Sequence, residues 1–344
     1  MGSTLVDIAR SGRRVLVFGA GGGGDILGAS IVWNRLRRLG ADALLGSVVW
    51  ERFTVDPFPG PIPIEMLAGA EPLGWSIALV DGETVALRYG STLKPQIVRV
   101  AGALGVKAIY LDLSKGERGL RQAFEDARRE LGVEVLVGVD TGGDMLAKGC
   151  EDNLWSPLAD AISLSAMVRS GLEAHVTILG PGADGELPTE QVLDYIASIA
   201  RMNGLEEVFG LDRRDYESAR KVEDAVVSEA GKLPLRAFEG KTGTTKIRGG
   251  TREVRLSPVL ATSYLLDARK TWEWTPLPRL VEDTAGIGQA SQALNEACVV
   301  TELDLEQELS RLREKGTARP VSLDEIRRGL RQRLMSRGCR PVHC

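Results

Sequence analysis

The sequence predicts a doubly wound α/β fold, with a mainly parallel Rossmann-like sheet, helices on both faces and a helical C-terminal extension. Three observations lead to this prediction. Strand-like and helix-like segments alternate over roughly the first 200 residues. A buried strand at 13–18, a glycine turn, a helix at 25–39 and a second strand at 43–50 form a βαβ unit. Highly charged sequence with helical spacing follows at 302–336.

The remaining elements follow from the spacing of apolar residues and from the glycines and prolines between them. Further buried strands are expected at 108–111, 133–139 and 174–179. Helices are expected at 93–104, 117–131, 157–170, 189–202 and 213–230, and 258–270 is expected to be mostly helical. A turn at Asp81-Gly82 predicts a hairpin over 77–88. Four prolines make 56–63 an extended loop, and the Gly- and Thr-rich segment 238–256 is expected to be mobile.

The chain is expected to have one main domain and an extension. Residues 1–300 form the Rossmann-like domain, which two similar glycine loops divide into possible halves at 1–132 and 133–300. Residues 301–344 form a charged helical extension with a tail.

The composition excludes several classes of protein. The 344 residues carry 43 basic and 47 acidic side chains, so there is no positive excess to bind nucleic acid. No apolar run approaches the roughly 18 residues that cross a bilayer, and the N-terminus lacks a signal-peptide core. We therefore expect a cytoplasmic protein that uses neither nucleic acid nor membrane as partner, and homo-oligomerisation stays open. Scarce amide side chains fit a heat-adapted protein.

Histidine and cysteine chemistry has little support. The two histidines, His175 and His343, are too few for a multi-histidine metal site, and a catalytic triad based on histidine is nearly excluded. Without a secretory signal, the four cysteines are not expected to form a disulfide framework.

The first glycine loop has the sequence of a nucleotide-binding turn. Gly19, Gly21 and Gly24 satisfy G-x-G-x-x-G directly after a strand and before a helix. The helix N-terminus favours an anion, and Glu51 ends the second strand where a ribose hydroxyl is held in dinucleotide sites. Taken alone, this loop predicts NAD(P) or a related nucleotide.

Asp25 argues against a plain dinucleotide site. Its carboxylate stands at the start of the helix, where it would repel a bare pyrophosphate. A bridging Mg²⁺ or Mn²⁺ would remove this repulsion. The alternative is that Asp25 only stabilises the helix terminus and that the glycines only make the turn.

A second loop repeats the chemistry after the strand at 133–139. Asp140 and Asp144 flank Thr141-Gly142-Gly143. Because both loops end parallel strands, we expect them at the same sheet edge, where the aspartates would bind a divalent cation or act as acid and base. The alternative is that each aspartate caps its own turn. Ser156 follows at a helix N-cap, where its hydroxyl either caps the helix or faces the pocket.

Lys241 and Lys246 lie in a basic loop with Arg248 and Arg252, which either closes over an anionic substrate or is simply solvated. Gly240-Lys241-Thr242 is not a P-loop, because Leu235 stands where that motif requires glycine.

Four motifs in this order resemble the DUF1152 family, a mainly archaeal group. They are VFGAGGGGDILGA, WERFTVDPFPGP, GVDTGGD and SPLADA, and the similarity covers about residues 1–300. The resemblance implies a stand-alone cytoplasmic α/β protein and assigns no reaction. The matching residues are Gly21 to Asp25, Trp50 to Arg52, Asp56, and Asp140 to Asp144.

The leading hypothesis is an enzyme acting on a small anionic, phosphorylated or nucleotide-like metabolite, a transferase or hydrolase rather than an oxidoreductase. Asp25, Asp140 and Asp144 are the catalytic candidates, and Asp25 and Asp144 are the metal-ligand candidates. The ligand-binding candidates are Gly19, Gly21, Gly22, Gly23, Gly24, Glu51, Arg52, Thr141, Gly142, Gly143, Ser156, Lys241 and Lys246. An NAD(P)-dependent oxidoreductase and a non-catalytic ligand-binding or assembly protein are the two alternatives.

Overall fold

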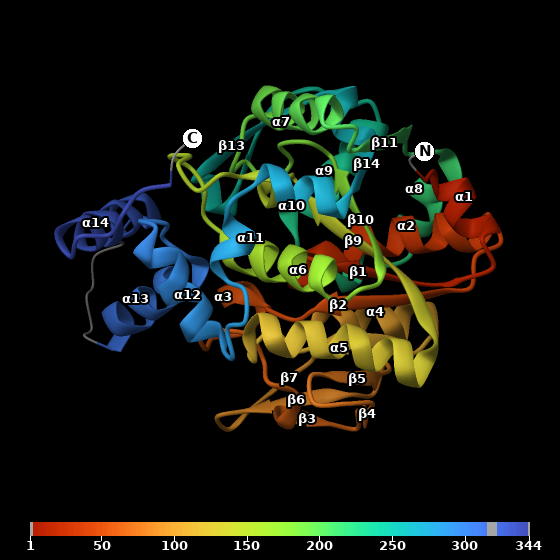
Figure 1. Cartoon of the computed structure of the whole chain (residues 1–344), viewed down its shortest axis with the longest axis horizontal. Helices are drawn as coiled ribbons and strands as arrows, with labels where there is room; N and C mark the ends of the chain where they lie inside the picture. Colours follow the sequence, from red (N-terminus) through yellow and green to blue (C-terminus); the bar gives the residue numbers. More distant parts are fainter. Residues whose placement is uncertain (1–2, 315–321, 343–344) are drawn as a thin grey trace.

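A nine-stranded mixed sheet forms the centre of the computed structural model, which describes residues 3–314 and 322–342 (Figure 1). The strand order is β11-β14-β10-β9-β1-β2-β8-β5-β4. These strands are β1 (Arg14–Gly19), β2 (Ala43–Val48), β4 (Glu71–Pro72), β5 (Ile77–Val80), β8 (Ala108–Leu111), β9 (Val133–Thr141), β10 (Glu173–Leu179), β11 (Leu205–Gly210) and β14 (Thr262–Asp267).

The five inner strands β10, β9, β1, β2 and β8 are mutually parallel. The chain passes from β1 to β2 and β8 on one side, then returns to β9 and β10 on the other. The strand order therefore reverses between β1 and β9. In open α/β sheets, ligands bind beyond the carboxyl ends of the strands at such a point.

Helices cover both faces of the sheet, because the parallel strands are apolar on both sides. The helices are α1 (Leu5–Arg10), α2 (Ile26–Arg38), α3 (Arg52–Val55), α4 (Gln96–Leu104), α5 (Gly116–Leu131), α6 (Pro157–Arg169), α7 (Thr189–Arg201), α8 (Arg213–Arg220), α9 (Glu229–Phe238), α10 (Ala268–Trp274), α11 (Leu277–Leu280), α12 (Ile287–Glu296), α13 (Glu302–Glu314) and α14 (Leu323–Ser336). Leu16 and Phe18 of β1 pack in one core with α5 and α6, whereas Val15 and Val17 pack in another with α2 and α4. The predicted doubly wound α/β fold with C-terminal helices is confirmed.

Several local predictions were wrong. Residues 77–88 do not form a hairpin: β5 pairs with β8 in the main sheet, whereas β6 (Val85–Arg88) pairs with β3 (Leu67–Ala68) and β7 (Ser91–Leu93). The predicted helix at 213–230 breaks into α8, a 3-10 turn at Glu223–Ala225 and α9. Ser228 starts α9, because its hydroxyl accepts a hydrogen bond from the Gly231 N–H.

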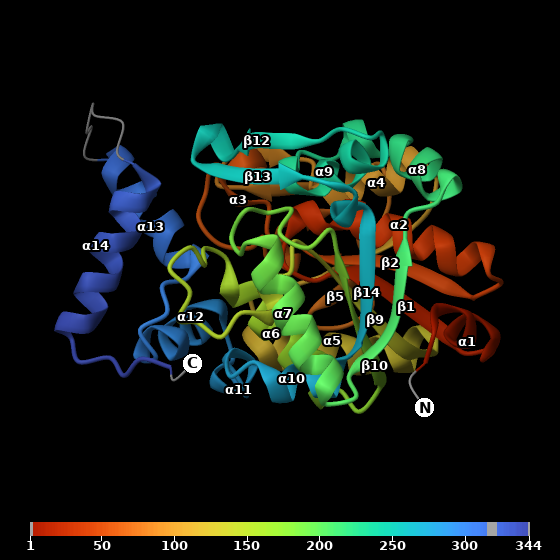
Figure 2. The same cartoon turned by 90° about the horizontal axis from the view of Figure 1, so that it is seen from above.

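Two further segments are strands. The segment 258–270 contains β14, which joins β10 and β11 in antiparallel pairing and so buries Leu265 and Leu266. The segment 238–256, expected to be mobile, contains the paired strands β12 (Gly243–Ile247) and β13 (Arg252–Leu256). Figure 2 shows this hairpin above α9.

The C-terminal helices α13 and α14 pack together at one end of the molecule (Figure 2). Leu305 of α13 and Ile326 of α14 share a small apolar core with Trp155. Glu302 of α13 also caps α6, since its carboxylate accepts hydrogen bonds from the Leu158 and Ala159 N–H groups, each at 3.0 Å. The first helix of the predicted extension is thus tied to the sheet domain.

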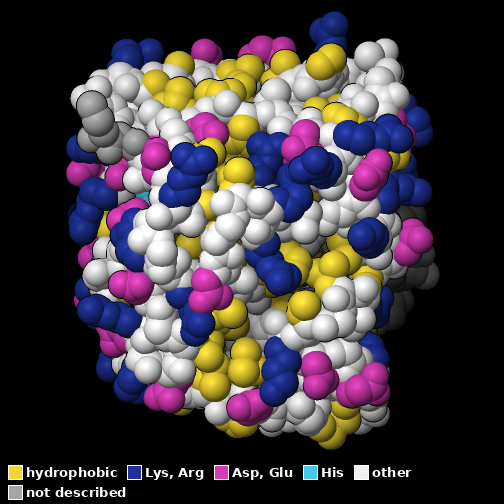
Figure 3. Space-filling view, turned by 90° about the vertical axis from the view of Figure 1, so that its right-hand side faces the viewer, with side chains coloured by type: hydrophobic (Ala, Val, Ile, Leu, Met, Phe, Trp, Pro, Cys, Tyr) yellow, Lys and Arg dark blue, Asp and Glu magenta, His cyan; other side chains and the backbone are white. Residues whose placement is uncertain are grey.

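Basic and acidic side chains are mixed on the molecular surface. The face in Figure 3 carries basic and acidic side chains side by side, with apolar side chains between them. Among the described helices, none is both long and apolar enough to pass through a bilayer.

The expectation that the cysteines form no disulfide framework was wrong. Cys298, just after α12, forms a disulfide with Cys339, which follows α14, across 41 residues of chain. His343 and Cys344 lie outside the described residues.

We predict that Cys339→Ser lowers the free energy of unfolding by about 2–4 kcal/mol, because the bond restricts the unfolded chain. Denaturant titration measures this change, and Ser336→Ala, on an exposed neighbour, should change it by less than about 0.5 kcal/mol. Peptide mapping without reductant should recover Cys298 and Cys339 in linked peptides. Alkylation of both thiols in the native protein would contradict this pairing.

Candidate functional site

Three loops meet at the carboxyl edge of the sheet, where the strand order reverses. They follow β1, β9 and β10, which are neighbours in the sheet. The loop after β1 is tied to β9 by a hydrogen bond from Ala20 N–H to the Val139 carbonyl (2.9 Å), and the loops after β9 and β10 are joined by one from Gly182 N–H to the Gly142 carbonyl (2.6 Å). The two predicted glycine loops are therefore spatial neighbours.

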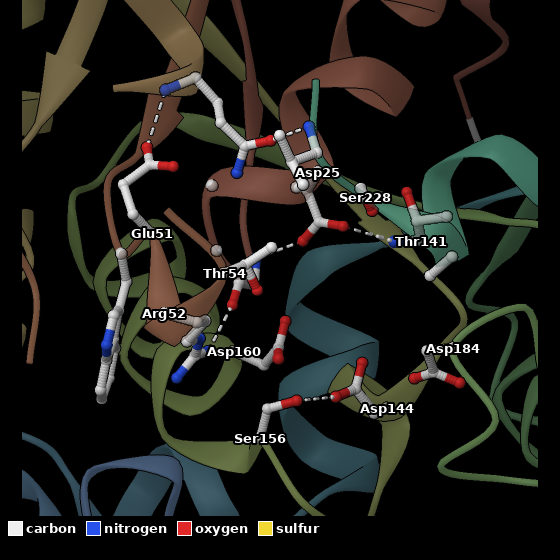
Figure 4. Close-up of a pocket in the computed structure, with 18 of the residues that line it drawn as sticks. Asp25, Glu51, Arg52, Thr54, Thr141, Asp144, Ser156, Asp160, Asp184 and Ser228 are labelled. Atoms are coloured by element: carbon white, nitrogen blue, oxygen red, sulfur yellow. Dashed lines mark hydrogen bonds between the residues drawn. The ribbon is translucent and has the colours of Figure 1, made fainter. Parts of the chain in front are cut away.

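Asp25 joins the two glycine loops through its carboxylate. One oxygen accepts a hydrogen bond from the Gly21 N–H (2.8 Å), and the other accepts one from the Thr141 N–H (3.3 Å), as Figure 4 shows. Burial raises the pKa of Asp25 to about 6, although both amides act in the opposite direction. The Asp25 carboxylate therefore links the two glycine loops.

Asp140, Asp144 and Asp160, here called the aspartate triad, lie next to this junction. One oxygen from each carboxylate lies within 4.8 Å of the others. All three side chains are buried. Asp144 and Asp160 face the cavity that lies between Asp25 and Arg52, here also called the crevice (Figure 4). The triad thus combines two predicted residues with one that the sequence analysis did not select.

The three carboxylates differ in how they are hydrogen-bonded. Asp140 accepts hydrogen bonds from the Gly143 N–H (3.4 Å) and the Met145 N–H (3.1 Å), as a turn-capping residue does. Asp144 accepts one from the Ser156 hydroxyl (3.1 Å). Neither oxygen of Asp160 has a hydrogen-bond partner among the described residues, although only 2% of this residue is exposed. Such a group is costly to bury without a partner.

Burial and mutual repulsion both disfavour the ionised triad. Burial is the largest cause that raises the pKa of Asp140, Asp144 and Asp160 well above the ordinary range. Repulsion from neighbouring carboxylates is the next cause for all three. A cation or bound protons would therefore stabilise this cluster.

Asp184 and Glu186 come from the loop after β10. Asp184 lies with Asp144 and Glu186 in a second group of carboxylates, and burial raises its pKa to about 7. Glu186 accepts hydrogen bonds from the Trp155 N–H (2.6 Å) and the Ser156 N–H (3.0 Å). Burial acts to raise the pKa of Glu186. Arg252 and the Ser156 hydroxyl act in the opposite direction, and the pKa lies below its ordinary value. Glu186 therefore fixes the loop that carries Ser156.

Arg52 supplies positive charge on the opposite wall. Its Nη2 donates to the Gly21 carbonyl and to Glu302, both at 3.0 Å, and its guanidinium lies 4.0 Å from the centre of the Trp50 ring. Its buried Nη1 has no hydrogen-bond partner among the described residues. The backbone of Arg52 has φ of 54°, a conformation unusual for a side chain with Cβ. The fold thus holds this guanidinium at the crevice with one donor unused.

The first glycine loop is packed by protein groups. The Gly21 N–H donates to Asp25, and the Gly23 N–H donates to the Trp50 carbonyl (3.0 Å). A Cβ on Gly21 would lie 2.8 Å from carboxylate oxygens of both Asp25 and Asp160. Glycine is needed here so that two carboxylates can approach the backbone, a different use from the cradling of a pyrophosphate.

The other sequence candidates divide into lining and non-lining positions. Gly22, Gly24, Glu51, Thr141 and Ser156 line the cavity. Behind its wall lie Gly19, Gly142 and Gly143, which leave room for neighbouring side chains. Lys241 and Lys246 do not line it: they point to Glu239 (3.4 Å) and Glu253 (3.6 Å) and are exposed. Arg248, from the same basic loop, does line it.

Sequence reasoning missed Asp160, Asp184 and Glu186 as site residues. The loop 180–186 is a third glycine-rich turn with acids directly after a buried strand, and this repeated pattern was a usable signal. Asp160 lies in the first turn of the helix that begins at Pro157. A carboxylate at that position also has an ordinary explanation in the helix dipole, so the sequence alone did not distinguish the two roles.

The cavity between these walls has a volume of about 80 Å³. A buried water needs on the order of 10–15 Å³ by this measure, so the cavity has room for a few waters or for an ion with one small anionic group.

Glu51 is a further titratable group in the wall. One oxygen accepts a hydrogen bond from the Gln96 N–H (2.9 Å), and the other is buried without a partner among the described residues. Burial raises the pKa of Glu51 to about 7. A carboxyl group that titrates near neutrality is suited to general acid–base catalysis.

We predict that Glu51→Gln stabilises the protein at pH 8 by roughly 2–3 kcal/mol and has little effect at pH 4.5. The folded-state pKa is raised, so the stability contributed by Glu51 is fully present below about pH 4.5 and is lost as pH rises to about 7. Denaturant titrations at several pH values measure the difference. Glu125→Gln, on an exposed residue of α5, is the control. An equal difference between Glu51→Gln and wild type at both pH values would contradict the burial of an ionisable Glu51.

Comparison with known proteins places the chain in a family. No curated protein matches it. The family model DUF1152, described as a protein of unknown function, matches residues 16–310. The match includes both glycine loops, the aspartate triad and Arg52, and it covers most of the chain. The chain therefore belongs to the DUF1152 family.

Proposed function

We propose that this chain is an enzyme that uses a divalent cation, Mg²⁺ or Mn²⁺, held by the aspartate triad, to transfer or hydrolyse a group on a small phosphate-bearing metabolite. One observation carries the proposal: Asp160 is buried beside two other carboxylates, and neither of its oxygens has a hydrogen-bond partner among the described residues.

The charge balance of the crevice supports a cation. An uncompensated buried carboxylate is expensive, and three close together are more so. The Coulombic attraction of Arg52 reaches Asp25, whereas the causes that follow burial at Asp160 are repulsions from other carboxylates. The triad offers only oxygen donors, without histidine or cysteine, and such donors suit Mg²⁺ or Mn²⁺.

The opposite wall supports an anionic substrate. Arg52 has a buried donor without a partner among the described residues, and Arg248 lines the same cavity. The hydroxyls of Thr54 and Ser228 also belong to lining residues. A phosphate between the triad and the arginines would meet positive charge on both sides. A divalent ion there would neutralise negative charge on the phosphate and polarise its oxygens.

The remaining residues have supporting roles in this proposal. Glu51, with a pKa near 7, takes or gives the proton at neutral pH. Asp25 holds the two glycine loops in register through the Gly21 and Thr141 amides. Because the Gly21 and Gly23 amides already donate inside the protein, the loop is less suited to a dinucleotide pyrophosphate, which favours transfer or hydrolysis over hydride transfer.

We predict that Asp160→Asn reduces Mn²⁺ affinity at least about tenfold, because the ion loses a carboxylate ligand. Isothermal titration calorimetry measures the affinity. In metal-free buffer at pH 8, the same variant should melt at a higher temperature than wild type, because one repelling charge is removed. Added Mn²⁺ should raise the melting temperature of wild type more than that of the variant.

The matched control is Asp126→Asn. Asp126 is equally buried but lies on α5, where Gln122 and Arg129 are its partners, and it does not line the cavity. Its replacement should leave Mn²⁺ affinity within twofold of wild type. Equal Mn²⁺ binding by wild type and Asp160→Asn, or no Mn²⁺ binding by a folded wild type, would refute the proposed cation site.

A further inference from the structure

A second cavity, here called the vestibule, opens from the crevice toward the C-terminal helices. Its volume is about 320 Å³, within the range of small-molecule sites. The two cavities share lining residues, namely Arg52, Thr54, Ser156, Glu186 and Arg248. The vestibule is therefore continuous with the proposed site.

Much of the vestibule lining is apolar, although Glu302 and Glu306 line it as well. Phe53 lines it from α3, Leu305 and Leu309 line it from α13, and Leu323 lines it from α14. Trp155, next to the start of α6, completes this wall. These side chains offer a partner contacts without hydrogen bonds, except for the indole N–H of Trp155, so they favour an apolar group over a polar one.

Three arginines stand between the acidic crevice and the apolar wall. Arg52 and Arg248 line both cavities, and Arg252 lines the vestibule. Arg252 pairs with Glu186 at 3.0 Å and lies 5.0 Å from the centre of the Trp155 ring. Loss of hydration lowers the pKa of Arg248, although the residue keeps exposed surface, and the positive charges of Arg252 and Arg52 lower it further. An anion at this junction would relieve that repulsion.

The same residues that build the crevice hold the vestibule wall in place. Glu302 of α13 pairs with Arg52 at 3.0 Å and caps α6. Glu306, one turn later, accepts hydrogen bonds from the Trp50 indole N–H (2.9 Å) and from the Gly60 N–H (2.8 Å). The position of α13, and hence of Leu305 and Leu309, is thus set by buried contacts with the site.

From this order of acidic, basic and apolar surfaces we infer the substrate class: a phosphate ester with a hydrocarbon chain. The inference rests on the proposed function. The phosphate lies between the triad-bound cation and the arginines, and the chain lies in the vestibule against Phe53, Leu309 and Leu323. A nucleotide fits this order less well, because its base and ribose would place polar groups against the apolar wall.

The test measures binding of inorganic phosphate and of ethyl, butyl, hexyl and octyl phosphate to the full chain in saturating Mn²⁺ by calorimetry. Each methylene that becomes buried should strengthen binding by about two- to fourfold until the vestibule is filled. Octyl phosphate should bind at least tenfold more tightly than AMP. Affinity that does not depend on chain length, or tighter binding of AMP, overturns the inference.

Substitutions in the vestibule wall test where the hydrocarbon chain of the ligand binds. Leu309→Asn and, separately, Leu323→Asn should weaken octyl phosphate binding at least fivefold and leave inorganic phosphate binding within twofold of wild type. Both side chains are only partly buried, so folding is expected to survive, and circular dichroism checks this. Leu280→Asn, on a more exposed leucine that does not line the vestibule, is the control for the loss of a surface leucine. Equal effects of all three substitutions overturn the inference.

The outcomes separate the two proposals. If wild type binds Mn²⁺ at Asp160 but its phosphate affinity is independent of chain length, only the substrate class fails. If wild type binds neither Mn²⁺ nor any of the phosphates, both the proposed function and the substrate class fail.

Discussion

Repulsion among buried carboxylates is the interaction that governs the crevice. The loops after β1, β9 and β10 end adjacent strands, so the sheet brings Asp25, Asp140, Asp144 and Asp184 together, and helix α6 adds Asp160. Burial raises the pKa of every one of them, and neighbouring carboxylates raise it further for all except Asp25. A protein of marginal stability keeps such a cluster only where compensation is available. At Asp160, the described residues provide no hydrogen bond, so a cation is the compensation that we propose.

Much of the surrounding structure serves to position these groups. Asp25 uses both oxygens to connect the glycine loops, and Glu186 fixes the start of α6 through the Trp155 and Ser156 amides. Glu302 reaches the same helix start from α13, while also holding Arg52. Through Glu302, the C-terminal helices connect the crevice with an apolar cavity. The site therefore draws on distant parts of the chain, namely the loops after β1, β9 and β10, the segment after β2, and the helices α6 and α13.

The sequence predicted the parallel core well because those strands are buried on both faces and have glycine turns at their ends, as β1 and β9 show. It failed next to the edge strand β11: β14 is as long as β1, and only its pairing with β10 and β11 distinguishes it from the helix that was predicted there. At the site, Asp140 and Asp144 could be found because they follow a recognisable turn. Asp160 reaches the cluster only through tertiary packing of α6, which local sequence does not encode. Lys246 belongs to the β12–β13 hairpin and pairs with Glu253, so it lies on the surface instead of at the cavity.

The most direct test of the central claim is anomalous X-ray diffraction from crystals grown with Mn²⁺. Our account predicts one anomalous peak about 2.1 Å from carboxylate oxygens of Asp140, Asp144 and Asp160, with Arg52 on the far side of the cavity. A crevice without such a peak, in which the three carboxylates keep their arrangement and share protons with one another, would contradict it.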